Sequence, residues 1–177
     1  MPSLQVDSLF FTFEPMAVAQ KYDDWHHYHA IWKNQEGGQK AVDVVAVDGA
    51  GENDVTWLIE AKDFRIITNP PKPSNIAGLP RTVASKASDT LAGLADAAEM
   101  AAITEEREHA IRALAAPSKR IVLHLEPHKG PRTALFPVGF SASVLQQLRQ
   151  LVKTIDPHPL VLNIANTPGA RVPWRVS

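Results

Sequence analysis

The sequence predicts an α/β fold in which a mixed β-sheet is flanked by helices. Short apolar runs with the length of buried strands alternate with longer segments whose apolar residues recur at helical spacing. The expected order is a helix, a strand hairpin, helices, a strand, a helix and a last strand, which is typical of layered proteins with a mixed sheet. A chain of 177 residues can bury a sizeable core, so we expect a single domain over residues 1–177.

The N-terminal part is expected to hold a short strand at residues 8–13, followed by an amphipathic helix. Glu14 and Pro15 resemble the start of this helix, because proline suits the first helical turn. Gly37 and Gly38 are expected to end it. The apolar stripe of the predicted helix consists of Val18, Tyr22, Trp25, His29 and Trp32.

The middle of the chain is expected to form a β-hairpin followed by a long helix. Residues 40–48 and 55–64 are the two strands, and the polar, glycine-containing residues 48–54 form the loop between them. Three prolines within residues 68–75 exclude a helix or a core strand there and predict an extended loop. An alanine-rich helix is expected at residues 81–102.

The C-terminal part alternates between helices and strands. A second helix is expected at residues 104–115, with a threonine cap and an acidic first turn. A buried strand at residues 119–126 and a polar loop at residues 127–133 follow it. Residues 141–155 have the apolar stripe of another helix, and residues 160–164 are the last predicted strand.

The two strands of the predicted hairpin carry charged residues where a buried strand should carry none. Asp43 lies within a run of valine and alanine, and Glu60 and Lys62 close the apolar run of the second strand. Residues two apart on a strand point to the same face, so the Glu60 carboxylate and the Lys62 ammonium project together. Clustered carboxylates repel one another and favour a hard cation. A buried ion pair, or charges that reach water at the strand ends, would explain the same residues.

Asp43, followed after sixteen residues by Glu60-Ala61-Lys62, resembles the motif of the PD-(D/E)XK nuclease superfamily. The resemblance covers about residues 14–125, with the motif itself in residues 39–63. It departs from the family pattern at Val42, where a proline often precedes the first acid. The resemblance implies a restriction endonuclease-like core of α-β-β-α-β order, in agreement with the order of elements expected from the periodicity.

The resemblance implies a Mg²⁺-dependent or Mn²⁺-dependent phosphodiesterase that hydrolyses nucleic acid, with DNA as the first choice. Asp43 and Glu60 would bind the metal together with the backbone carbonyl of Ala61. Lys62 would orient or help to deprotonate the attacking water, or stabilise the phosphate. Such an ion supplies a polarised water and neutralises phosphate oxygens.

Two further residues are candidates for the same site. Glu14 matches the additional acid that some members of the family place on the first helix, although it also suits the negative charge that favours any helix start. Lys86 lies near the start of the helix after the proline-rich loop, where several branches of the family place a lysine or glutamine that points at the site. A solvated surface lysine is the alternative.

The histidines at positions 26, 27 and 29 suggest zinc at first sight, but the spacing does not support it. On a helix, His26 and His29 share a side while His27 points away, and no His-Glu-x-x-His pattern is present. His29 also falls on the predicted apolar stripe. We therefore expect a structural role for these histidines.

Composition excludes some classes of protein and favours others. The chain has no cysteine, which excludes disulfides and thiolate sites and fits a reducing compartment such as the cytoplasm. Its first residues lack the basic start and apolar run of a secretory leader, and it has no apolar stretch of about 20 residues, so we expect neither a signal peptide nor a membrane partner. Residues 1–60 hold three Lys and Arg against ten Asp and Glu, whereas residues 117–177 hold eight against two. The basic part could face phosphates through Lys119, Arg120, Lys129, Arg132, Arg149 and Lys153.

Two alternatives to a nuclease remain open from the sequence. The chain could have a nuclease fold without catalysis and serve as a nucleic-acid-binding or assembly module. It could also be an unrelated α/β protein with a buried ion pair. A nuclease of this size often needs a homodimer to cut two strands, and the sequence does not decide the oligomeric state.

Overall fold

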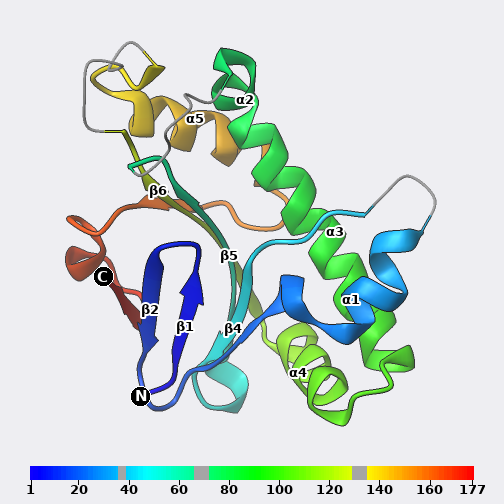
Figure 1. The fold of residues 1–177 in the computed structure, drawn as a ribbon. Helices are drawn as coiled ribbons and strands as arrows, with labels where there is room; N and C mark the ends of the chain where they lie inside the picture. The colour runs from blue at the N-terminus through cyan, green and yellow to red at the C-terminus, as the bar shows by residue number, and fades with distance from the viewer. Residues whose placement is uncertain (36–38, 66–71, 129–134) are drawn as a thin grey trace.

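The computed structural model describes residues 1–35, 39–65, 72–128 and 135–177. It is a mixed α/β fold with two sheets and flanking helices (Figure 1). The larger sheet has five strands in the order β3-β4-β5-β6-β7. Its strands are β3 (Val18–Lys21), β4 (Val44–Asp48), β5 (Val55–Asp63), β6 (Ser118–Glu126) and β7 (Leu160–Leu162). The pairs β3-β4 and β4-β5 are antiparallel, whereas β5-β6 and β6-β7 are parallel, so the predicted mixed sheet is confirmed.

The two faces of the larger sheet are covered by different kinds of layer (Figure 1). One face carries the helices α3 (Leu79–Met100), α4 (Thr104–Ala115) and α5 (Phe140–Val152), which form the crossovers between the parallel strands. The other face carries an antiparallel sheet in the order β1-β2-β8. Its strands are β1 (Ser3–Val6), β2 (Leu9–Phe13) and β8 (Trp174–Val176).

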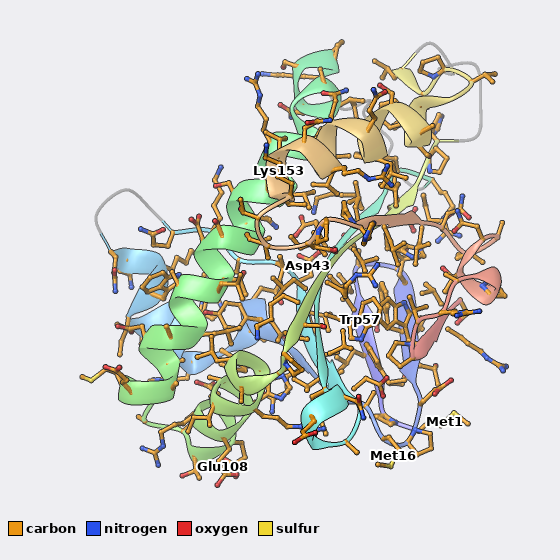
Figure 2. All side chains as sticks on the ribbon, turned by 180° about the vertical axis from the view of Figure 1, so that it is seen from behind. Met1, Met16, Asp43, Trp57, Glu108 and Lys153 are labelled. Carbon is orange, nitrogen blue, oxygen red and sulfur yellow. The ribbon has the colours of Figure 1, made fainter. Side chains whose placement is uncertain are left out.

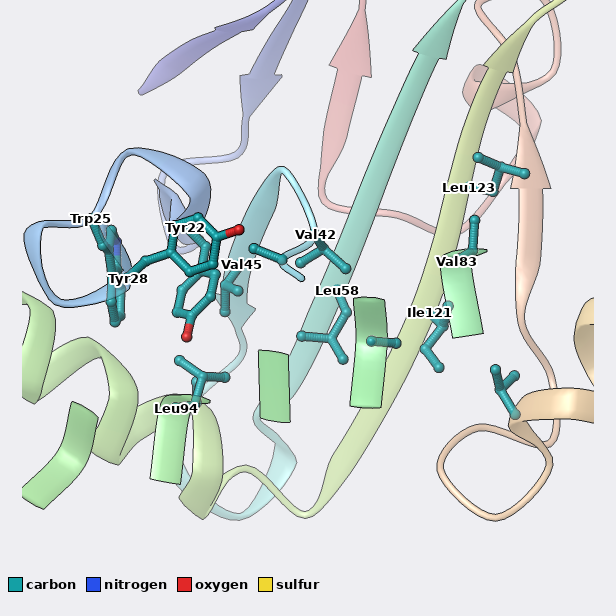
Figure 3. Packing of buried hydrophobic residues seen from close by; sticks show 14 of the residues in the cluster. Tyr22, Trp25, Tyr28, Val42, Val45, Leu58, Val83, Leu94, Ile121 and Leu123 are labelled. Atoms are coloured by element: carbon teal, nitrogen blue, oxygen red, sulfur yellow. The ribbon is translucent and has the colours of Figure 1, made fainter. Parts of the chain in front are cut away.

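Burial on both faces explains why the central strands read as nearly continuous apolar runs. Leu58 of β5 points to the helices and packs in one core, while its neighbours Trp57 and Ile59 point to the smaller sheet and pack in a second core. Figure 3 shows the first core, in which Leu58 and Ile121 of neighbouring strands meet side chains of α3. A charged residue on β4 or β5 therefore has no solvated face to occupy, except near the strand ends.

The helix predicted after Pro15 is wrong. The chain there forms β3, the 3-10 helix η1 (Tyr22–Asp24), the short helix α1 (His26–Ala30) and the 3-10 helix η2 (Trp32–Asn34). Pairing with the edge of β4 provides the backbone of β3 with hydrogen bonds that a local pattern cannot reveal. The aromatic residues of the predicted stripe are nevertheless buried: these are Tyr22, Trp25 and Trp32.

Gly93 of α3 allows this aromatic segment to pack closely. A Cβ atom at position 93 would lie 2.3 Å from the hydroxyl oxygen of Tyr22 and 2.7 Å from the Nε1 atom of Trp32. Tyr22 and Trp32 of the predicted stripe are therefore buried against α3 although the backbone there is not one continuous helix, whereas Val18 and His29 of the stripe are exposed.

Most of the other predicted elements are present. The expected hairpin is β4 and β5, and the expected helices and strands that follow correspond to α3, α4, β6, α5 and β7. The strands β1 and β8 were not predicted. The expectation that the prolines exclude a helix within residues 68–75 is wrong at Pro73, where the short helix α2 (Pro73–Ala77) begins with proline in its first turn. Residues 68–71 of the expected loop lie outside the described residues. In the described part of the chain, no helix is long and apolar enough to cross a membrane.

Candidate functional site

The candidate residues Asp43, Glu60 and Lys62 come together at one end of the hairpin. Asp43 directly precedes β4, and Glu60 to Lys62 lie near the end of β5. Because the two strands are antiparallel, with Val44 opposite Ile59, the start of β4 lies beside the end of β5. The backbone N–H of Ala61 donates a hydrogen bond of 2.6 Å to the Asp43 carboxylate. The hairpin register therefore fixes the position of Asp43 relative to the second acid.

Lys86 of α3 completes a cluster of two acids and two bases. Its ammonium donates to both carboxylate oxygens of Glu60, at 2.7 and 2.8 Å, and lies 3.8 Å from an oxygen of Asp43. The Lys62 ammonium lies 2.6 Å from Glu60 and donates to the backbone carbonyl of Ala61 at 3.0 Å. Of the two acids, Glu60 is the more deeply buried, with a side chain only 1% exposed. The four charges balance, so the cluster is electrically neutral as it stands.

Burial and neighbouring charges shift the ionisation of this cluster. Burial raises the pKa of Glu60, and the Asp43 charge raises it further, while the two lysines act in the opposite direction. Burial alone would lower the pKa of Lys62, but the charges of Glu60 and Asp43 outweigh it, so this pKa is raised overall. Lys62 is therefore a cation in this state. A positive ligand that neutralised the carboxylates would remove the interaction that raises this pKa.

The donor set fits a hard divalent cation. Two carboxylates and the Ala61 carbonyl offer the oxygen ligands that Mg²⁺ and Mn²⁺ prefer, and Mg²⁺ keeps several waters of its own. No group of three or more His, Cys, Asp or Glu side chains placed to hold a metal is found within the described residues. A site of the expected kind would thus rely on two acids, one carbonyl and water. The ammonium of Lys86, which donates hydrogen bonds to both oxygens of the Glu60 carboxylate, would have to move away for a cation to bind there.

Asp23 of η1 is a third acid in this region, and its place in the site was not predicted from the sequence. The backbone N–H of its neighbour Tyr22 donates to the Asp43 carbonyl at 3.0 Å, so η1 is held beside Asp43. Burial raises the pKa of Asp23, and the charge of Asp43 raises it further. Its Oδ1 atom is buried and has no hydrogen-bond partner in the part of the chain that the structure describes. An acid in an aromatic segment expected to be helical gave no signal in the sequence.

Glu14 is not part of this cluster. It follows β2, where its backbone N–H donates to the Pro173 carbonyl, so its expected place on a first helix is wrong. Its charge contributes to the raised pKa of Asp48, which is at the opposite end of β4 from Asp43. Figure 2 shows the neighbouring Met16 at the bottom of the molecule, well separated from Asp43. The reason is that the chain continues from β2 into β3 and reaches Asp43 only through η1.

Two of the three histidines, His26 and His27, make structural contacts, whereas His29 is exposed and its expected place on a buried apolar stripe is wrong. His27 is buried with its Nε2 atom 2.8 Å from Asp96 of α3. The backbone N–H groups of His26 and His27 donate to the carboxylate of Glu106 from α4, at 2.7 and 3.1 Å. Glu106 thereby satisfies free N–H groups at the start of α1. His29 is exposed on the opposite side of the helix from His27.

Two of the basic C-terminal residues, Lys119 and Arg120, lie away from the acid–lysine cluster and have partners of their own. Lys119 donates to the carbonyls of Leu114 and Ala116. Arg120 pairs with Asp156 and lies over the ring of Trp57. Lys119 and Arg120 lie at the start of β6, whose register places them beside the start of β5 and thus at the other end of the sheet from Glu60.

Arg149 is in the last turn of α5, and Lys153 directly follows that helix. Lys129 and Arg132 lie outside the described residues.

Comparisons with known proteins give one finding. The chain is 30% identical, over 213 aligned residues, to a cysteine–tRNA ligase of Neisseria meningitidis serogroup A. The similarity covers the whole of this chain and only 30% of the ligase, so the chain spans less than a third of the length of that protein. A comparison with models of protein families finds no match, and neither does a comparison with solved structures.

Proposed function

We propose that the protein is a metal-dependent nuclease that hydrolyses phosphodiester bonds, with DNA as its first expected substrate and Mg²⁺ or Mn²⁺ as its cofactor. The observation that carries the proposal is the convergence of Asp43, Glu60, Lys62 and Lys86 from three elements at one end of the hairpin. Buried charges are costly, and ionisable groups of perturbed pKa gather at functional sites more often than elsewhere.

The arrangement of elements around the cluster supports membership of the PD-(D/E)XK superfamily with its restriction endonuclease-like core. The antiparallel pair β4-β5 is followed by α3 and then by β6, which is parallel to β5. This is the β-β-α-β part of the expected order, and both acids lie in it. The helix expected before it is replaced by β3, η1 and α1, and Asp23 of η1 would take the place proposed for Glu14 beside the first acid.

Each residue of the cluster has a role that its geometry supports. Asp43 and Glu60 would hold the cation together with the Ala61 carbonyl, and the cation would polarise a water and neutralise phosphate oxygens. Lys62, which is charged in this state, would stabilise negative charge on the phosphate. It could accept a proton from water only after the charges of the two acids are neutralised. Lys86 would turn from Glu60 to the substrate, as a second cation at the phosphate.

The similarity to part of a cysteine–tRNA ligase adds RNA to the substrates that deserve a test. The name of that protein refers to a tRNA, and nothing in this chain's cluster distinguishes DNA from RNA. A binding or assembly module without catalysis is the second candidate. The observation that favours it is the neutral state of the cluster, in which both acids already have lysine partners.

The decisive experiment is a cleavage assay with plasmid DNA, linear duplex DNA, single-stranded DNA and RNA. Each substrate is incubated with Mg²⁺, Mn²⁺ or EDTA, and wild-type protein is compared with Asp43→Asn and Lys62→Ala. Arg107→Ala, which removes an exposed charge on α4, is the control. Metal-dependent cleavage that both site variants lose and the control retains supports the proposal. Cleavage that persists in Lys62→Ala, or none with any substrate, contradicts it.

A further inference from the structure

A cavity of about 300 Å³ adjoins the acid–lysine cluster and is not used by the chemistry proposed above. We refer to it as the α1 cavity. Asp43 and Lys86 form the wall that it shares with the cluster. Its lining residues are Asp23, Tyr28, His29, Lys33, Lys40, Ala41, Asp43 and Lys86. A ligand in the α1 cavity would therefore lie directly beside the reacting phosphate.

The walls of the α1 cavity are held in place by contacts from α3 and α4. Glu106 of α4 anchors the start of α1 through the two hydrogen bonds described above. On the other side, the backbone N–H of Lys40 donates to Asp89 of α3 at 3.0 Å, and that of Val42 donates to the Thr90 hydroxyl at 3.0 Å. The backbone around the cavity is thus anchored, while the side chain of Lys40 remains exposed. Such a cavity binds a ligand with little ordering cost.

The charges of the α1 cavity suit an anion when the neighbouring acid holds a cation. Lys33 and Lys40 are exposed, and they form none of the ion pairs found within residues 1–35, 39–65, 72–128 and 135–177. Asp23 is the other acid among the lining residues. Neutralisation of Asp43 would leave the lysines as the dominant charge, and lysines beside a backbone-binding site are typical of phosphate contacts.

The α1 cavity also offers aromatic surface. The rings of Tyr28 and His29 meet edge to face, with centroids 5.4 Å apart, and the His29 side chain is exposed. Proteins that bind single strands combine a positively charged groove with aromatic or histidine rings on which bases stack. A volume of about 300 Å³ is at the lower end for small-ligand sites and suits one nucleotide better than a base pair.

We propose that the α1 cavity binds one unpaired nucleotide next to the scissile phosphate, so that the substrate is single-stranded or locally unpaired nucleic acid. Lys33 and Lys40 would contact its phosphate, and His29 would stack on its base. This inference rests on the proposed nuclease function, because it takes the neighbouring phosphate to be the one that is cut. It extends that function by naming the class of strand that the enzyme accepts.

The test compares Lys33→Ala/Lys40→Ala and His29→Ala with a charge-matched control, Arg107→Ala/Arg175→Ala, which removes exposed charges from α4 and β8. Fluorescence anisotropy measures binding of a labelled single-stranded DNA, its RNA counterpart and the duplex, each at several salt concentrations. Cleavage of the same oligonucleotides with Mg²⁺ is measured in parallel, and circular dichroism checks that every variant is folded.

We expect single strands to bind more tightly than the duplex and to be cut faster. The double lysine variant should reduce the slope of log K against log salt by about 0.7 for single strands, since the two lysines contact one phosphate and each contacted phosphate contributes about 0.7. His29→Ala should weaken single-strand binding by about fivefold or more. The charge-matched control should keep the wild-type slope, and the DNA and RNA arms decide which kind of strand is preferred.

The outcomes separate this inference from the proposed function. If the wild-type protein cuts duplex and single strands equally and the double lysine variant behaves as its control does, the α1 cavity proposal is wrong and the nuclease proposal stands. If nothing is cut with any metal but the lysine variant still loses single-strand binding, the cavity binds nucleotides and the nuclease proposal is wrong. If the Arg107→Ala/Arg175→Ala control reduces the salt slope as much as the double lysine variant does, the proposal that the α1 cavity binds the nucleotide is also wrong.

Discussion

The Thr90→Val variant tests whether α3 sets the position of Asp43. The Thr90 hydroxyl, which is fully buried, accepts a hydrogen bond of 3.0 Å from the backbone N–H of Val42. Valine has nearly the same shape but leaves that N–H without a partner, which costs about 1–3 kcal/mol of folding free energy. For a protein of this size, each kcal/mol lowers the Tm by about 2–4 °C, so we expect a decrease of roughly 2–12 °C.

A loss of stability alone would not show a role in positioning, so a matched variant is needed. Thr56 is also fully buried, and its hydroxyl donates to the Ala113 carbonyl at 2.6 Å. Thr56 lies near the start of β5, at the opposite end of the hairpin from Asp43. Thr56→Val should therefore lose a similar amount of stability without disturbing the site.

The assay that distinguishes the two variants is a Mg²⁺ titration followed by thermal melting and, for an active enzyme, by cleavage rate. A ligand at 100 times its Kd stabilises the folded state by about 2.7 kcal/mol. We expect the wild-type and Thr56→Val proteins to show the same half-saturating Mg²⁺ concentration, and Thr90→Val to need several times more. If Thr90→Val loses stability but keeps the wild-type Mg²⁺ response, Asp43 does not depend on this bond and the reasoning is refuted.

Three further predictions concern packing and pH. Gly93→Ala should lower stability by about 1–3 kcal/mol in urea denaturation, since its Cβ would lie 2.3 Å from the Tyr22 hydroxyl, whereas Gly169→Ala, with open space around it, should change little. Burial lowers the pKa of His109 to about 4, below its usual 6.5, so the unfolded chain binds the proton more tightly than the folded protein. The free energy of unfolding should therefore fall by up to about 3 kcal/mol as the pH drops from 7 to 4. His109→Gln should reduce this fall, and a variant with the wild-type pH profile of stability would contradict the prediction. Because burial raises the pKa of Glu60 above 4.5, the affinity for Mg²⁺ should fall as acid protonates this carboxylate. Calorimetric titrations at several pH values measure this affinity, and a constant value would be inconsistent with Glu60 as a ligand.

The candidate site was partly accessible from the sequence because its main elements are close together in the chain. Asp43 directly precedes β4 and Glu60 lies near the end of β5 in one hairpin, so strand periodicity and a short loop were enough to predict that they meet. Lys86 could be placed near the site by its distance after β5, but its contact with both oxygens of Glu60 depends on how α3 crosses the sheet.

The N-terminal third shows where the sequence was insufficient. The aromatic residues from Tyr22 to Trp32 have helical spacing, but the chain forms β3, η1, α1 and η2 instead. Two long-range contacts decide this outcome: the pairing of β3 with β4, and the fit of Tyr22 against Gly93. Propensity is a weak local preference, and tertiary pairing overrides it when the backbone gains partners on an open sheet edge. The same contacts place Asp23 beside Asp43 and leave Glu14 at the other end of the sheet.

By itself, the sequence determined the mixed α/β class, the β4-β5 hairpin, the helices α3 to α5 and the meeting of Asp43 with Glu60, because each of these follows from periodicity or from neighbours in the chain. The tertiary structure alone decided the second sheet, the acid at position 23 and the α1 cavity. Each of these joins segments far apart in the sequence, such as β2 with β8, or η1 and α1 with α3. Contacts of that kind depend on how whole elements pack, and no local pattern of residues encodes them.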